Sequence, residues 1–282
     1  MEELNFNDTS FINDFNYSNM SHYIRYSDPE ILYDIKCFVD WVTIAIGFPL
    51  VIIILIAVFF QVKNGQDAPV YVINLLVSDI IQFCSRIFVY FDYFSLIPIL
   101  ITFYALLVSV GFMMCISCER YLVVAKPLWY RFRRTIKTYV VVCTVVWILP
   151  FLFPLLIFIT TGVKMIGIII TVFLLLPFPL FIFFLVGTIK ALYGAFNVPA
   201  DEKRRIAAIQ VVELIIYTLL FVPIIFWILA SYIDFMHTLF WNDVAFICVF
   251  LSPVADITLY LFSRKSFMDK FLASICCKIS NN

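Results

Sequence analysis

Residues 117–127, SCERYLVVAKP, close the third of seven long apolar stretches in this chain. An arginine at the end of a transmembrane segment is costly in hydrocarbon, so Arg120 needs a structural or functional reason to be there. A basic anchor at the lipid headgroups is the simplest such reason. The preceding acid, Glu119, the following Tyr121 and Pro127 seven residues after the arginine favour a more specific role.

The composition places the chain in a lipid bilayer. Hydrophobic residues make up 64% of it and charged residues 13%, whereas a soluble domain is about half apolar and a quarter charged. A spanning helix needs roughly 20 apolar residues, and seven stretches reach that length. Because the bilayer core offers no water to backbone groups, we predict an all-α integral membrane protein, a seven-transmembrane-helix bundle with short connections. The stretches are 38–62, 69–91, 95–118, 138–160, 166–193, 207–233 and 239–262.

The basic residues predict the topology. Of the 19 Lys and Arg, 15 fall on one side of the predicted spans, and the positive-inside rule makes that side cytoplasmic. We therefore expect an extracellular N-terminal segment (1–37), a seven-helix membrane domain (38–262) and a cytoplasmic amphipathic eighth helix with a tail (263–282). The first span is expected to act as the insertion signal, because no signal-peptide pattern precedes it.

Both terminal segments carry candidate modification sites. Asn7, Asn16 and Asn19 open three sequons on the side predicted to be extracellular, which favours glycosylation. At the other end, the tail helix would end in Cys276 and Cys277, where palmitoylation would add a membrane anchor. The alternative is a pair of unmodified cysteines.

The Glu119-Arg120-Tyr121 motif resembles the Asp/Glu-Arg-Tyr end of helix three in rhodopsin-like (class A) G-protein-coupled receptors. In that family the arginine pairs with the preceding acid at rest and meets the G-protein on activation. The resemblance places Pro127 and Leu128 where the second inner loop contacts the G-protein. The arginine side chain suits this role because it stays charged and binds carboxylates in two-pronged fashion.

Helices six and seven extend the resemblance. Phe221 and Pro223 match the family's toggle and kink, and Asp256 with Tyr260 resembles the variant helix-seven motif of the purinergic, lipid and proton-sensing branch. Two positions depart from the pattern. Ile257 stands where that branch has proline, and Val51 stands where helix one has asparagine, so the switch region of this chain is altered.

The resemblance implies a mechanism in which helix six moves outward about Pro223 and exposes Arg120, Leu128 and the basic residues 203–205. Lys203 stands where many relatives carry an acid that locks the arginine, so raised basal activity is expected. Glu213, in the inner half of helix six, either pairs with Arg120 or stays neutral and hydrogen-bonded. The sequence leaves this open.

Two acids face each other at mid-membrane if the family geometry holds. Asp79 and Asp256 would then share a sodium ion, which is the one candidate cofactor, or else a proton or a water network.

Arg86 is the basic residue deepest in the predicted outer half, and it suits a carboxylate or phosphate ligand. The alternative is an internal pair with Asp92 or Asp79. Further residues would line the same cavity in the family geometry and give it an apolar character. These are Thr102, Phe103, Leu106, Phe226, Trp227 and Asn242.

Cysteine use departs from the family as well. The usual outer disulfide would need a cysteine near Ser95 and another in loop 160–167, and the sequence has neither. Cys37 is the cysteine expected to face outside, so no disulfide is predicted.

We interpret the chain as a plasma-membrane, multi-pass receptor for an unknown extracellular ligand, small and acidic or lipid-like, with heterotrimeric G-protein and membrane lipids as partners and no nucleic acid. The alternative is a non-signalling receptor-like partner or decoy subunit, which Val51, Ile257 and the missing disulfide motivate. A transporter lacks its expected inverted repeat, an opsin lacks its lysine in helix seven, and no enzyme site is evident.

Overall fold

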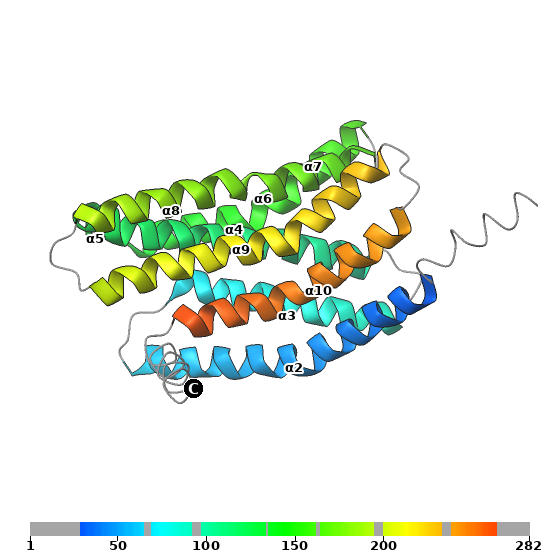
Figure 1. The fold of residues 1–282 in the computed structure, drawn as a ribbon, viewed down its shortest axis with the longest axis horizontal. Coiled ribbons are helices and arrows are strands. Elements are labelled where there is room, and N and C mark those ends of the chain that lie inside the picture. The colour runs from blue at the N-terminus through cyan, green and yellow to red at the C-terminus, as the bar shows by residue number, and fades with distance from the viewer. Residues whose placement is uncertain are drawn as a thin grey trace, which may run out of the picture.

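The protein is described here by a computed structural model covering residues 29–64, 69–91, 97–133, 135–161, 164–194, 200–232 and 238–263. Within these ranges the chain is helical, with short turns and no strand. Figure 1 shows the helices running side by side in an elongated bundle. Their bounds are α2 Pro29–Lys63, α3 Val70–Phe91, α4 Ile97–Ala125, α5 Pro127–Arg133, α6 Ile136–Thr161, α7 Lys164–Leu175, α8 Pro177–Gly194, α9 Ala200–Ser231 and α10 Thr238–Ser263.

Within the described part of the chain, six segments are long and apolar enough to cross a membrane, and α6 contributes a shorter apolar helix, Ile136–Leu152. This arrangement confirms the predicted multi-pass helical bundle. We call the end at which α2 begins, on the right of Figure 1, the outer end, following the charge-based topology, and the opposite end the inner end. The predicted eighth helix lies outside the described residues.

Prolines explain where several helices bend or end. Pro49 lies inside α2, where it removes a backbone donor, and Figure 1 shows this helix bending near its middle. Pro127 disfavours a helical Lys126, so α4 ends at Ala125 and the proline begins α5. Pro177 similarly divides the predicted fifth span into α7 and α8, and the Tyr217 hydroxyl donates to the Leu174 carbonyl beside this break at 2.7 Å.

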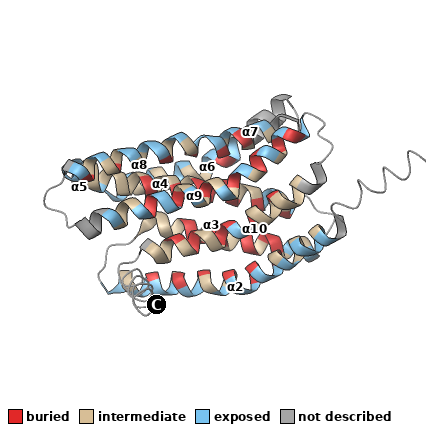
Figure 2. Ribbon diagram, in the orientation of Figure 1, coloured by how far each residue is buried: buried red, intermediate tan, exposed pale blue. Residues whose placement is uncertain are grey.

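The apolar core has two parts. The larger one is centred on α4, which packs against α3, α6 and α8, and includes Leu106, Phe112 and Phe221. The smaller one joins α2, α3 and α10. Figure 2 shows buried residues facing the bundle interior and exposed residues on its outside. Since many of the exposed residues are large and apolar, this surface suits contact with lipid.

Val51 and Ile257 lie together in the smaller core, with exposed fractions of 0% and 1%. These are two of the positions at which the sequence departs from the receptor pattern. Their side chains fill space between α2, α3 and α10 by apolar packing where the family pattern would place an asparagine and a proline. Both departures therefore belong to the same apolar cluster.

Gly47 provides the close approach of α2 to α3. A Cβ atom at this position would lie 2.6 Å from Phe83 Cζ, and the Phe83 ring is itself fully buried. We predict that Gly47→Val lowers the free energy of unfolding by about 1–3 kcal/mol, the usual cost of overpacking. Thermal unfolding of the purified protein measures this. Ile46→Val, on the exposed face of the same helix, is the control and should leave stability unchanged; equal effects would contradict the account.

Candidate functional site

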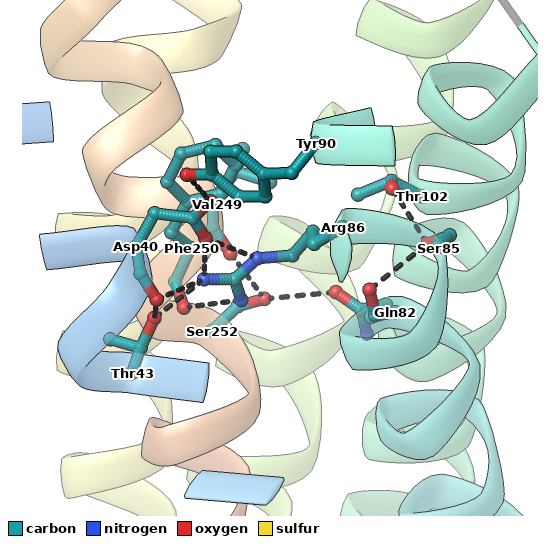
Figure 3. Close-up of polar contacts among 10 residues, drawn as sticks. All are labelled: Asp40, Thr43, Gln82, Ser85, Arg86, Tyr90, Thr102, Val249, Phe250 and Ser252. Atoms are coloured by element: carbon teal, nitrogen blue, oxygen red, sulfur yellow. Dashed lines mark hydrogen bonds and ion pairs between the residues drawn. The ribbon is translucent and has the colours of Figure 1, made fainter. Parts of the chain in front are cut away.

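A buried ion pair joins three helices in the outer half of the bundle. Arg86 of α3 donates through Nε to Asp40 Oδ1 of α2 at 2.7 Å, and its Nη2 also contacts that carboxylate. Figure 3 shows the guanidinium lying between the two helices and reaching the Phe250 carbonyl of α10, 3.0 Å from Nη1. Thr43 accepts a further bond, and the Tyr90 hydroxyl donates to Asp40 Oδ2 at 2.6 Å.

The contacts of Arg86 distinguish between its two interpretations, a binding site for an anionic ligand and an internal ion pair. The side chains of Arg86 and Asp40 are only 3% and 5% exposed, and most of the guanidinium donors are used inside the protein. Arg86 therefore forms an internal ion pair, and among the described residues its partner is Asp40 rather than Asp79; Asp92 lies outside the described residues. The sequence contained a signal for this, because Asp40 is the one acid within the first predicted span.

Below the ion pair, hydrogen bonds tie α3 to its other neighbours. Ser85 and Thr102 join α3 to α4 through their hydroxyls at 2.7 Å. On the other side, the Ser252 hydroxyl of α10 contacts Gln82 Oε1 at 3.5 Å. Figure 3 shows these groups forming a polar belt across the bundle at one level. Together these hydrogen bonds link α3 to α4 and α10 just below the ion pair.

An outer cavity of about 330 Å³ lies between α2, α3, α4 and α10. Its charged lining residues among those the structure describes are Lys36, Asp40 and Arg86, and the rest of the lining is largely aromatic or aliphatic. Three of the predicted ligand-binding residues line it: Arg86, Thr102 and Phe103.

The other four predicted ligand residues lie elsewhere. Leu106 is fully buried in the core. Phe226 packs edge-on against Trp241 with ring centroids 4.6 Å apart, and Trp227 lies 6.0 Å from the Phe246 ring. Asn242 contacts Asp243 at 3.5 Å. The cavity is thus displaced from the predicted position toward α2, and sequence reasoning missed Tyr33 and Lys36 in its lining.

The two mid-membrane carboxylates are fully buried neighbours. Asp79 Oδ1 accepts from Gln82 at 3.3 Å, and Asp256 Oδ2 accepts from the Ser109 hydroxyl at 2.7 Å. Asp79 Oδ2 has no hydrogen-bond partner among the described residues. An unpartnered buried oxygen beside a second carboxylate fits either a small cation or a shared proton, because two adjacent negative charges repel each other.

At the inner end, Arg120 of α4 faces Glu213 of α9. Its Nη1 lies 3.7 Å from Glu213 Oε2, a charge contact longer than a hydrogen bond. The Glu213 side chain is 5% exposed and that of Arg120 24%. A small cavity of about 30 Å³ is lined by both residues together with Asp256 and Tyr260. Glu213 therefore pairs with Arg120, one of the two interpretations that the sequence left open.

Glu119 has different partners. Its Oε1 accepts from the Tyr139 hydroxyl of α6 at 3.0 Å and from the Tyr130 hydroxyl of α5. Burial, followed by the hydrogen bond to Glu119, raises the pKa of the Tyr130 phenol. Among the described residues, the ion pair of Arg120 is thus with Glu213 and not with the preceding acid that the resemblance implied.

The remaining switch residues have other neighbours. Tyr121 packs against Phe183 and Phe184 of α8, and a Cβ on Gly187 would lie 2.5 Å from its ring. Phe221, two residues before Pro223 in α9, is buried against Tyr217, which lies one turn earlier in the same helix. Leu128 follows Pro127 in α5 and is 75% exposed.

Several predicted sites lie outside the described residues. These are the sequon positions Asn7, Asn16 and Asn19 and the tail cysteines Cys276 and Cys277. The six cysteines that the structure describes, Cys37 among them, are free thiols.

Comparisons with known proteins all point to the same class, seven-helix receptors. The sequence profile of the 7 transmembrane receptor (rhodopsin family) matches residues 50–166. G-protein coupled receptor 68 from Homo sapiens is 32% identical over 121 residues, 39% of this chain and 33% of the relative. Mas-related G-protein coupled receptor MRG from Homo sapiens is 33% identical over 107 residues, 33% of this chain and 28% of the relative.

The aligned region thus spans about a third of the length of these relatives. The profile match, residues 50–166, contains the Glu119-Arg120-Tyr121 motif, and the resemblance to rhodopsin-like receptors predicted from that motif is confirmed. The match ends before α9, which carries Glu213 and Pro223, and before α10, which carries Asp256. The roles of these residues rest on the structure.

The Arg86–Asp40 pair yields a stability prediction. Asp40→Asn leaves the buried guanidinium uncompensated, so we expect a loss of about 3–5 kcal/mol in unfolding free energy, the usual cost of breaking a buried pair. The double variant Asp40→Asn with Arg86→Met removes both charges and should lose less than the single one. Thermal unfolding of purified protein provides the comparison. A double variant as unstable as the sum of its two single variants would show that the charges are not coupled.

Proposed function

We propose that this protein is a rhodopsin-like receptor that transmits an extracellular signal to heterotrimeric G-proteins. One observation carries the proposal: Arg120, in the motif shared with such receptors, is paired across the bundle with Glu213 of α9. The pair links α4, which packs against α3, α6 and α8, to the long helix that also contacts α7, α8 and α10. A movement of α9 would therefore change the partner of the arginine.

The ion pair suits a switch because its acid is buried and its geometry falls short of a hydrogen bond. Glu213 Oε2 has no hydrogen-bond partner within the described residues, and its distance to Arg120 leaves only a charge–charge attraction. In a low-dielectric interior that attraction is substantial, but it competes with the hydration both groups would regain on separation. An outward movement of the inner half of α9 about Pro223 would separate them and turn Arg120 toward the cytoplasmic surface.

This pairing changes the expectation for basal activity. The sequence predicted an unlocked receptor because Lys203 replaces a locking acid. Glu213, ten residues further along α9, supplies an acid from inside the bundle instead. The reason for expecting raised basal activity is therefore removed, and we propose that Glu213 holds the resting state.

Polar residues connect the two ends of the bundle. Gln82, beside the outer ion pair, donates to Asp79; Asp79 neighbours Asp256; and Asp256 lines the small cavity that holds Arg120 and Glu213. Such a series supports coupling between an outer ligand and the inner switch, because each group changes the electrostatic environment of the next. We propose that a sodium ion or a shared proton stabilises the Asp79–Asp256 pair at its centre.

The remaining parts of the proposal follow the same topology. The N-terminus would be extracellular and glycosylated at Asn7, Asn16 and Asn19, and the tail would be cytoplasmic and palmitoylated at Cys276 and Cys277, in the plasma membrane. The ligand would be small and either acidic or lipid-like, since the outer cavity combines cationic residues with apolar walls.

Ligand-free G-protein dissociation in cells, normalised to surface level, tests the switch. Glu213→Gln keeps the shape of the side chain but removes the charge that holds Arg120, so we predict a basal signal several-fold above wild type. Adding Arg120→Ala should abolish that signal. If Glu213→Gln gives no signal through any G-protein class despite normal surface expression, the proposal fails and the non-signalling interpretation gains.

Leu128 provides a second test at the predicted contact surface. Because its side chain is exposed, Leu128→Ala should not destabilise the fold but should lower the signal of the Glu213→Gln variant several-fold. Val123→Ala, on the exposed face of α4, is the matched control. An equal loss of signal for both variants would show that Leu128 makes no specific contact with the G-protein.

A further inference from the structure

Lys36 differs from Arg86 in how its donors are used. Its ammonium group donates to Asp243 Oδ1 of α10 at 2.7 Å and lies 4.6 Å from the centroid of the Tyr33 ring. An ammonium has three N–H donors, so two have no hydrogen-bond partner among the described residues. Arg86, by contrast, is committed to Asp40, Thr43 and the Phe250 carbonyl.

The cavity lining adds a charge argument. Among the described residues, Lys36 and Arg86 line the cavity as cations and Asp40 as its one anion, whereas Asp243 is not part of the lining. The Arg86 and Asp40 charges compensate each other. Lys36 is itself paired with Asp243, but Asp243 is not among the lining residues, so Lys36 is the cation of the lining whose acidic partner lies outside the lining. The mostly buried state of both side chains, 18% and 14% exposed, limits screening by solvent.

The walls beside Lys36 are apolar. Away from the ammonium the cavity is bounded by Val89, Ile99, Phe103, Phe246, Val249 and Phe250. A ligand that buries an alkyl chain there gains roughly 25 cal/mol for each Å² of apolar surface removed from water. A molecule with one anionic end and an apolar body would therefore satisfy both parts of the cavity at once.

We propose that this cavity binds an amphipathic monoanion, with its carboxylate or phosphate group on the Lys36 ammonium and its alkyl chain against the apolar walls. Asp243 and the ligand anion then compete for the same ammonium, while the Arg86–Asp40 pair forms the floor and stays intact. The inference deepens the proposed receptor function, on which the biological meaning of the site rests, by naming the chemistry of the ligand and the residue that recognises it.

Cys37 is a natural reporter of the site, because it is a free, partly exposed thiol in the same cavity lining. The full-length protein in nanodiscs of neutral phosphatidylcholine is labelled with N-ethylmaleimide, and modification at Cys37 is read by peptide mass spectrometry. The probes are decanoate, decyl phosphate and uncharged decanol. We expect the anions to slow labelling at concentrations where decanol has little effect; the more potent anion identifies the headgroup. Equal protection by decanol would overturn the proposal.

Two variants separate recognition from structure, because both break the same ion pair. Lys36→Met should weaken protection by the anion roughly tenfold or more, the value of a charge-assisted hydrogen bond. Asp243→Asn should strengthen it, since a competing acceptor is lost. Lys63→Met, at the exposed inner end of α2, should change nothing. If Lys36→Met and Asp243→Asn shift protection in the same direction, the pair is only structural and the proposal is wrong.

The labelling rate of Cys37 without a probe is measured for every variant, so that altered accessibility is not mistaken for altered affinity. No G-protein is involved in this assay. Loss of anion binding with an intact Glu213→Gln signal would therefore overturn the ligand inference alone. Anion binding without any G-protein signal would overturn the receptor proposal, while the inferred anion-binding site would still stand.

Discussion

A charged side chain inside a bilayer must find its partner within the protein, because neither lipid nor bulk water can compensate it. In this bundle that constraint organises the polar residues at three levels. Arg86 and Asp40 form a closed ion pair in the outer half, Asp79 and Asp256 face each other in the middle, and Arg120 meets Glu213 toward the inner end. The apolar cores of the helices surround these groups and fix where each partner can come from.

The three levels differ in how completely their groups are satisfied. The outer pair has many hydrogen bonds and low exposure, which suits a permanent joint between α2, α3 and α10. The inner pair has a long contact and an unpartnered oxygen. A fully satisfied network resists rearrangement, whereas a partly satisfied one gains from exchanging partners. The physical contrast therefore assigns stability to the outer level and switching to the inner one.

Sequence reasoning predicted the helices well and the contacts between them less well. Apolar length set the spans to within a few residues for most helices, since bilayer thickness is a strong constraint. Sequence reasoning began the first span at residue 38, two residues before Asp40, and did not consider Asp40 as a partner for Arg86. The structure begins α2 at Pro29, which places Asp40 well inside the helix and opposite Arg86. Partners between distant segments, such as Glu119 with Tyr139, depend on helix rotation, which no local pattern encodes.

The central claim is that Glu213 holds the inner half of α9 against α4. Distances between spin labels on unnatural amino acids at Val123 and Arg204, both exposed near the inner end, test it most directly in nanodiscs by pulsed electron resonance. The account predicts that Glu213→Gln shifts the distance distribution toward longer values relative to wild type. An unchanged distribution would contradict it.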